Sequence, residues 1–165
     1  MSDDSKPILR LGLKRLDPVT LVSSDPVLRR SPFVVALGAG REEILRGGGA
    51  RRLAKGMRLW GPGDEAREVL LVAAGTVQVF AKDGAQAVPA LELGAGEVVG
   101  ASAALGHRQR SCVVVCASEV DAIVWEGVDL ALLAHTDPKV AGVLEEAARR
   151  EEEAADELSA FLDRW

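Results

Sequence analysis

The sequence predicts a mainly β domain, an antiparallel roll with helices before and after it. Between Arg51 and Trp125 the chain consists of short β-type runs separated by glycine-bearing turns. Short, regularly spaced runs of this kind are typical of an all-β barrel or sandwich. After Trp125 the apolar spacing becomes helical, and neither glycine nor proline follows Gly142. We therefore expect about eight strands over residues 51–125, followed by a helix that runs to Trp165.

Each element is predicted from local signals. The expected strands are residues 58–60, 69–72, 76–81, 87–91, 98–99, 111–116 and 122–125. Gly84 can adopt the positive φ that a hairpin turn after Asp83 requires. Short helices are expected from Pro26 to Phe33, over 41–45 and over 129–134. Asp137 is the expected N-cap of the long helix, and Pro138 its first residue.

Composition narrows the class of protein. The 165 residues fit one domain, and 48% of them are hydrophobic, enough for a core. A net charge of −5 excludes a general affinity for nucleic acid. The first residues lack the cationic start of a signal peptide, and no segment is apolar over a membrane-spanning length. Cys112 and Cys116 would lie about 13 Å apart on one strand, too far for a disulfide. We expect two buried thiols in a cytoplasmic protein.

The order of the glycines carries more information than their number. Three segments, KGMRLWGPGD at 55–64, VLLVAAGTVQV at 69–79 and LGAGEVVG at 93–100, resemble the cyclic-nucleotide-binding domain family. The glycines in register with that family are Gly56, Gly63, Gly75, Gly96 and Gly100. Each falls where a turn needs positive φ or a close approach of the backbone.

The resemblance covers about residues 28–150 and implies an antiparallel β-roll, a jelly-roll-like double-stranded β-helix of the catabolite-activator type. It implies a lead-in helix over 28–37 and hinge and lid helices over 129–146. Residues 1–27 are then an N-terminal arm, either packed on the domain or, as an alternative, docking a partner. Residues 151–165 continue the C-terminal helix.

The resemblance also implies a phosphate-binding cassette within residues 99–112. In the family, backbone N–H groups and an arginine bind the cyclic phosphate, while a glutamate accepts from the ribose. Gly100, Arg110 and Ser111 match this pattern. Ala101 replaces the glutamate, and Gln109 replaces a proline. The candidate ligand-binding residues are Gly100, Ala101, Ser102, Arg110, Ser111 and Cys112.

The loss of the ribose carboxylate predicts a degenerate pocket. A hydrogen bond to a charged group contributes roughly 1.5–3 kcal/mol, or one to two orders of magnitude in affinity. We therefore expect weak or unmeasurable binding of cyclic AMP and cyclic GMP, with a small anion as another weak ligand. Ala101→Glu is expected to improve binding.

No other constellation indicates catalysis. His107 and His135 are the only histidines, fewer than a metal-dependent barrel needs, and we interpret His107 as a solvated loop residue. No nucleophile elbow or phosphate-binding Walker loop appears. We expect no catalytic residues, no metal and no enzyme activity.

Two functional interpretations remain from the sequence. The favoured one is a non-catalytic regulatory or docking module with a degenerate pocket, acting through a protein partner. The alternative is a sensor that binds cyclic AMP, cyclic GMP or a cyclic dinucleotide and signals through its C-terminal helix. Since no recognition helix follows the long helix in this sequence, we expect no DNA binding, and we expect no membrane partner.

Residues 138–165 also predict a homodimer through a heptad seam. Its members are Val140, Leu144, Ala147, Glu151, Ala154, Leu158, Phe161 and Trp165. Glu151 would be costly at a tight interface. In the alternative interpretation, Leu158, Phe161, Leu162 and Trp165 fold back over the roll or an empty pocket.

Overall fold

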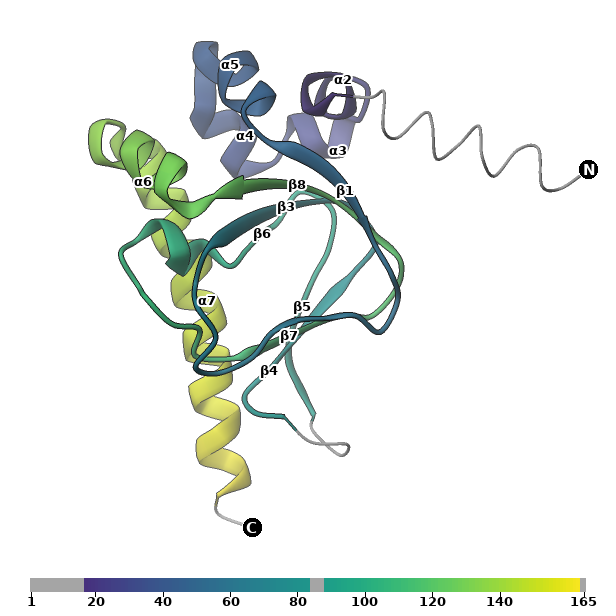
Figure 1. The fold of residues 1–165 in the computed structure, drawn as a ribbon, viewed down its shortest axis with the longest axis vertical. Coiled ribbons are helices and arrows are strands. Elements are labelled where there is room, and N and C mark those ends of the chain that lie inside the picture. Colours follow the sequence, from purple (N-terminus) through teal and green to yellow (C-terminus); the bar gives the residue numbers. More distant parts are fainter. Residues whose placement is uncertain (1–16, 84–87, 164–165) are drawn as a thin grey trace, which may run out of the picture.

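The computed structural model describes residues 17–83 and 88–163, with Leu162 described by its backbone alone. The expectations for Gly84, for Trp165 and for residues 1–16 of the arm lie outside the described residues. Within them, eight strands form two four-stranded antiparallel sheets, with helices at both ends of the sequence (Figure 1). The predicted antiparallel roll with flanking helices is confirmed.

The two sheets interleave in sequence. The first has the order β1-β8-β3-β6, with bounds Gly49–Leu53, Val120–Glu126, Glu68–Ala74 and Val98–Val99. The second has the order β2-β7-β4-β5, with bounds Arg58–Trp60, Val113–Cys116, Val77–Phe80 and Pro89–Leu93. Neighbours in each sheet are mostly distant in the chain, so the strands wind from one sheet to the other as a roll.

Strand β3 is buried on both faces of the first sheet, which explains its unbroken apolar run. Leu70 and Val72 point between the sheets, into a core cluster that includes Val79, Val99 and Val114. The alternate side chains of β3, Val69 and Leu71, belong to a second core cluster together with helical residues. Successive side chains of a strand point to opposite faces, so a strand between two apolar layers is apolar throughout.

Strand β1 has no strand signal of its own in the sequence, because Gly49–Leu53 reads Gly-Ala-Arg-Arg-Leu. It pairs with β8 over five residue pairs. Arg51 lies 2.8 Å from Glu68, and Arg52 lies 2.9 Å from Asp121. Pairing with β8, and acids on β8 and β3, therefore stabilise an arginine-rich segment that its intrinsic propensity does not favour.

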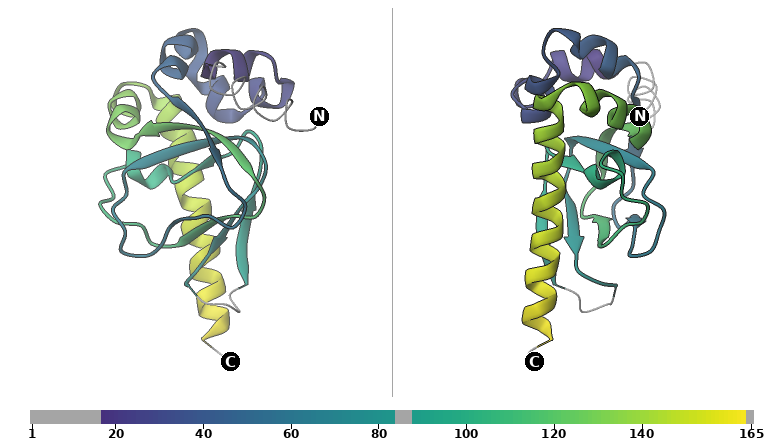
Figure 2. Two further views of the ribbon diagram at one scale, coloured as in Figure 1. Left: turned by 45° about the vertical axis from the view of Figure 1, so that its right-hand side comes forward. Right: turned by 90° about the vertical axis from the view of Figure 1, so that its left-hand side faces the viewer.

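Short helices cover one end of the roll (Figure 2). They are α2 (Pro18–Ser23), α3 (Pro26–Arg29), α4 (Pro32–Leu37), η1 (Gly38–Gly40) and α5 (Arg41–Arg46). Asp17 and Asp25 cap α2 and α3, and a proline follows each cap. The single stretch expected over 26–33 is divided at Ser31, whose hydroxyl donates to the Gly96 carbonyl at 2.6 Å.

Helices α6 (Gly127–Thr136) and α7 (Pro138–Leu162) follow the last strand. The Asp137 carboxylate accepts from the Lys139 N–H at 3.0 Å, which confirms the predicted N-cap. Helix α7 runs along the side of the roll, from the end near α4 to beyond the opposite end (Figure 2). None of the helices in the described ranges is both long and apolar enough to cross a membrane.

Candidate functional site

Gly100 marks the start of the candidate cassette. It lies between β6 and the short helix η2 (Ala101–Ala104) with φ 78°. A Cβ atom there would lie 2.6 Å from the Trp60 ring and 2.8 Å from Arg110 Nη1. Both the backbone conformation and the close approach of these side chains therefore require glycine. All five glycines of the sequence register have positive φ.

Arg110 is buried in this site, with 5% of its surface exposed. Its Nη1 donates to the Gly100 carbonyl at 2.9 Å, and its Nη2 donates to the Glu68 carbonyl. The guanidinium carbon lies 3.7 Å from the centre of the Trp60 ring, a cation–π arrangement. Burial lowers the pKa of Arg110, while nearby Glu151 raises it. Its Nε is buried without a hydrogen-bond partner among the described residues.

Helix α7 carries Glu151 into the same place. Its side chain is 5% exposed, and its carboxylate accepts a hydrogen bond from the Gly100 N–H at 3.2 Å. Burial raises the pKa of Glu151 to about 7, against the opposing effects of the Gly100 N–H and of Arg110. The cassette backbone thus binds a carboxyl group from the chain itself.

Little space remains between Arg110 and α7. The hollow there has a volume of about 10 Å³, and Trp60, Ser102, Cys112 and Glu151 are among its lining residues. Arg110 and Trp60 also line a separate hollow of about 390 Å³, which Glu68 and Glu126 share and no described residue of α7 lines. Ser111 also lines it and is otherwise exposed. Burial raises the pKa of the Cys112 thiol to about 12, so the thiol stays protonated and unreactive. Cys112 and Cys116 are both buried free thiols, as predicted.

Ala101 occupies a different environment from the hollow. It is fully buried and belongs to the core cluster that η2 shares with α6 and α7. Neighbours in that cluster include Ala104, Leu130, Val140 and Leu144. A glutamate at this position would bury its carboxylate in an apolar layer, away from water. We therefore expect Ala101→Glu to destabilise the folded protein.

The structure brings Gly100, Ser102, Arg110, Ser111 and Cys112 together around one hollow. Sequence reasoning missed Trp60 and Glu151. The signal for Glu151 was present, since it is the one acid on the buried face of α7, where Val140, Leu144, Ala148 and Ala155 are apolar. Val140, Leu144 and Glu151 face the roll, so they are not available to the predicted dimer seam, and the homodimer itself stays a prediction.

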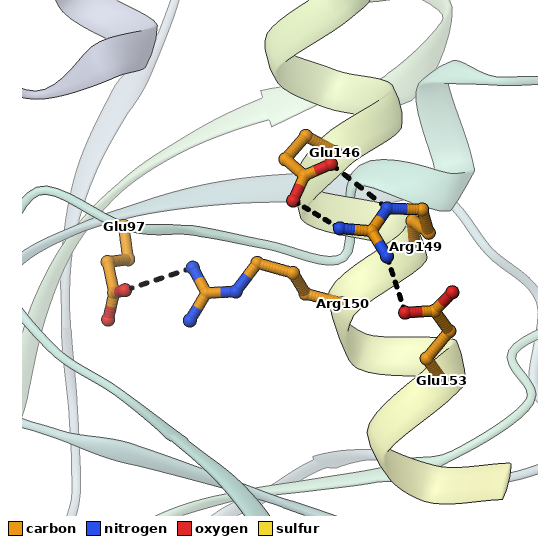
Figure 3. A network of polar contacts seen from close by, with 5 residues as sticks. All are labelled: Glu97, Glu146, Arg149, Arg150 and Glu153. Atoms are coloured by element: carbon orange, nitrogen blue, oxygen red, sulfur yellow. Dashed lines mark hydrogen bonds and ion pairs between the residues drawn. The ribbon is translucent and has the colours of Figure 1, made fainter.

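Beside this site, a network of ion pairs lies along the middle of α7 (Figure 3). Arg149 binds Glu146 and Glu153 on its own helix, three and four residues away. Arg150 reaches across to Glu97, which precedes β6, at 3.3 Å. The second pair ties α7 to the roll one residue before Glu151.

An apolar groove lies between α4 and α7, where Glu97, Glu146 and Arg150 also contribute to its lining. Its volume is about 700 Å³. Apolar side chains that line it include Phe33, Val35, Ala36, Val98, Val143 and Ala147. Val35 is 63% exposed, a high value for an apolar side chain. We call this hollow the α4–α7 groove.

The described residues contain no cluster of three or more histidine, cysteine, aspartate or glutamate side chains suited to a metal ion. His107 is exposed, and its Nδ1 lies 3.6 Å from a Glu152 carboxylate oxygen.

Comparison with known families decides the relationship. The model of the cyclic nucleotide-binding domain matches residues 50–137, more than half of the chain. The chain belongs to the cyclic nucleotide-binding domain family. This confirms the resemblance inferred from the glycine register. A comparison with curated protein sequences found no match.

Solved structures of this family share the fold. The catabolite activator protein of Thermus thermophilus is 28% identical, with a TM-score of 0.62, over 79% of this chain and 63% of that one. The N-terminal domain of a transcriptional regulator from Streptomyces coelicolor is 24% identical, with a TM-score of 0.58, over 81% and 94%. A regulatory subunit of a cAMP-independent protein kinase A from Trypanosoma brucei is 17% identical, with a TM-score of 0.57, over 75% and 49%.

Proposed function

We propose that this cyclic nucleotide-binding domain is a non-catalytic regulatory module with a degenerate pocket that acts through a protein partner. The observation that carries the proposal is the hollow of only about 10 Å³ between Arg110 and α7. A nucleotide needs a cleft of several hundred Å³. Helix α7 and Glu151 fill the space at the cassette, so a cyclic nucleotide has no place there in this conformation.

Two further features support a degenerate pocket. Ala101 supplies no carboxylate for a ribose, and two nitrogens of Arg110 are already bound to backbone carbonyls. The fold itself does not require cyclic AMP for regulation, since the similar Trypanosoma brucei subunit is described as cAMP-independent. The same comparison supports a regulatory and non-catalytic role.

The alternative function is a small-ligand sensor that signals through α7. It is favoured by the gathering of Gly100, Arg110 and Ser111 in the arrangement that binds a phosphate in the family. In that case a cyclic nucleotide would have to displace Glu151 and move α7 away from the roll.

Calorimetry separates the two functions. The unchanged protein is expected to give no measurable heat of binding with cyclic AMP, cyclic GMP or cyclic di-GMP up to high micromolar concentrations. A dissociation constant near or below a micromolar for any of them would favour the sensor.

We propose the α4–α7 groove as the site of the protein contact. Its apolar lining and the exposed side chain of Val35 favour an apolar partner segment. Val35→Asp is expected to abolish capture of the partner. Val128→Asp is the matched control, since Val128 is equally exposed at 64% but lies on α6, outside the groove lining. Equal capture by both variants would contradict this placement.

A further inference from the structure

We infer that Glu151 is an internal ligand of the cassette, which holds α7 on the roll as a strap that an external anion can displace. The inference rests on the proposed function, in that the closed pocket does not take a cyclic nucleotide freely. It concerns how this closure is maintained and what opens it.

The buried position of Glu151 on α7 is costly for a carboxylate. Glu151 is the acid in a row of otherwise apolar residues that pack on the roll: Val140, Leu144, Ala148 and Ala155. A buried carboxylate costs several kcal/mol unless polar partners compensate it. An apolar residue would suit this packing better, so the acid requires another explanation.

Glu151 contacts the backbone of the cassette. Its carboxylate accepts from the Gly100 N–H, and the Arg110 guanidinium is close enough to lower its pKa. Backbone amides and a guanidinium are the donors that bind carboxylate and phosphate oxygens alike. A carboxyl group from α7 thus accepts from one donor, the Gly100 N–H, beside a guanidinium that also suits a small oxyanion.

Arg110 has one hydrogen-bond donor that no described residue uses. Its Nε is buried and has no partner among the described residues, although most buried polar atoms have one. The described residues show no ion pair between Glu151 and Arg110, and Glu151 accepts from Gly100 instead. The site therefore satisfies its internal carboxylate incompletely, and a ligand with more acceptor oxygens could use the remaining donor.

The described side chains of α7 beyond Glu151 bury little apolar area against the roll. Beyond Glu151, Ala155 is the buried apolar residue among the described side chains of α7, and its single methyl group buries little area, while Leu158 is partly buried. The side chains of the Arg150–Glu97 pair are 45% and 36% exposed, and exposed pairs contribute little. The hydrogen bond from Gly100 to Glu151 is therefore one of the few buried contacts described for the second half of α7.

Calorimetry on Glu151→Ala tests this inference, with inorganic phosphate and cyclic AMP as probes. Removal of the internal carboxylate should increase the affinity for both anions by roughly tenfold or more over the unchanged protein. Glu145→Ala is the control, because it removes the same charge from an exposed position on α7. It should bind as weakly as the unchanged protein.

The outcomes distinguish this inference from the proposed function. If Glu151→Ala and the unchanged protein both fail to bind, the internal ligand is wrong while the proposed function stands. If the unchanged protein binds cyclic AMP tightly, the proposed function is wrong. Gain of phosphate binding without cyclic AMP binding supports an anion site and overturns any nucleotide specificity.

A measurement on the unchanged protein covers the case of a variant that does not fold. The amide resonance of Gly100 should titrate with the carboxyl group that it contacts, and the change should vanish in Glu151→Gln. A Gly100 amide that does not respond to the ionisation of Glu151 would overturn the inference. Hydrogen exchange should also be faster over residues 152–162 in Glu151→Ala than in Glu145→Ala.

Discussion

The Arg110 guanidinium lies 3.7 Å from the centre of the Trp60 ring, and it donates a hydrogen bond to the carbonyl of Gly100. One side chain thus joins β2 to the turn that begins the cassette. Arg110→Lys would keep the charge but lose the planar stack and one of the two carbonyl bonds. We expect the free energy of unfolding to fall by about 2 kcal/mol in denaturant titrations.

Arg108→Lys is the control for this variant, because Arg108 is exposed two residues earlier. It should leave the stability unchanged within about 0.5 kcal/mol. Equal stability of both lysine variants would show that the Arg110 contacts contribute little.

Gly100→Ala should destabilise the protein more than Gly106→Ala. Both glycines have positive φ, 78° and 87°. A Cβ at Gly100 meets Trp60 and Arg110, whereas one at Gly106 meets nothing within 4 Å. Gly106→Ala should cost about 1 kcal/mol from backbone strain alone, and Gly100→Ala at least about twice that. Thermal unfolding of the two variants compares them directly.

The glycines were also the most informative part of the sequence. Their register predicted the roll because a positive φ is a local property that few other residues supply. Strand β1 could not be predicted in the same way, since Arg51 and Arg52 are stabilised by partners on distant strands. The strand signal there is tertiary.

The sequence grouped residues that do lie together in the structure, but it did not predict that Glu151 lies among them. Gly100 and Arg110 were assigned from local motif residues, and the structure places them side by side. Glu151 lies 51 positions from Gly100, and its heptad spacing was interpreted as a seam for a second chain. The sequence does not say which surface an amphipathic helix covers. Packing against a partner and packing against the chain's own roll both require the same pattern of apolar residues.

The free energy of unfolding should depend on the ionisation of Glu151. Burial raises its pKa in the folded protein from 4.5 to about 7, so the folded state keeps a proton that the unfolded chain loses. The contribution to stability is therefore complete below the unfolded pKa and is lost as the pH rises through about 7. The loss should be about 3 kcal/mol.

Comparison with Glu151→Gln isolates this effect, since the amide does not titrate. The difference in unfolding free energy between the two proteins should change in favour of the glutamine variant between about pH 5 and about pH 8. Exposed acids with lowered pKa values, such as Asp83 and Glu146, are common to both proteins and cancel. A difference that is constant with pH would contradict the burial of an ionisable Glu151.

The predicted homodimer would use the part of the seam that does not face the roll, Ala147, Ala154 and Leu158, which are partly exposed. Light scattering should then give twice the monomer mass at high micromolar concentration, and Leu158→Glu should give the monomer. A monomer for the unchanged protein at that concentration would count decisively against the dimer.

The central claim is that the chain's own helix closes the cassette against a cyclic nucleotide. Titration of the unchanged protein with cyclic AMP in a calorimeter tests it most directly, with Glu151→Ala titrated in parallel. We expect no measurable binding to the unchanged protein and measurable binding to the variant. A dissociation constant near or below a micromolar for the unchanged protein would contradict it.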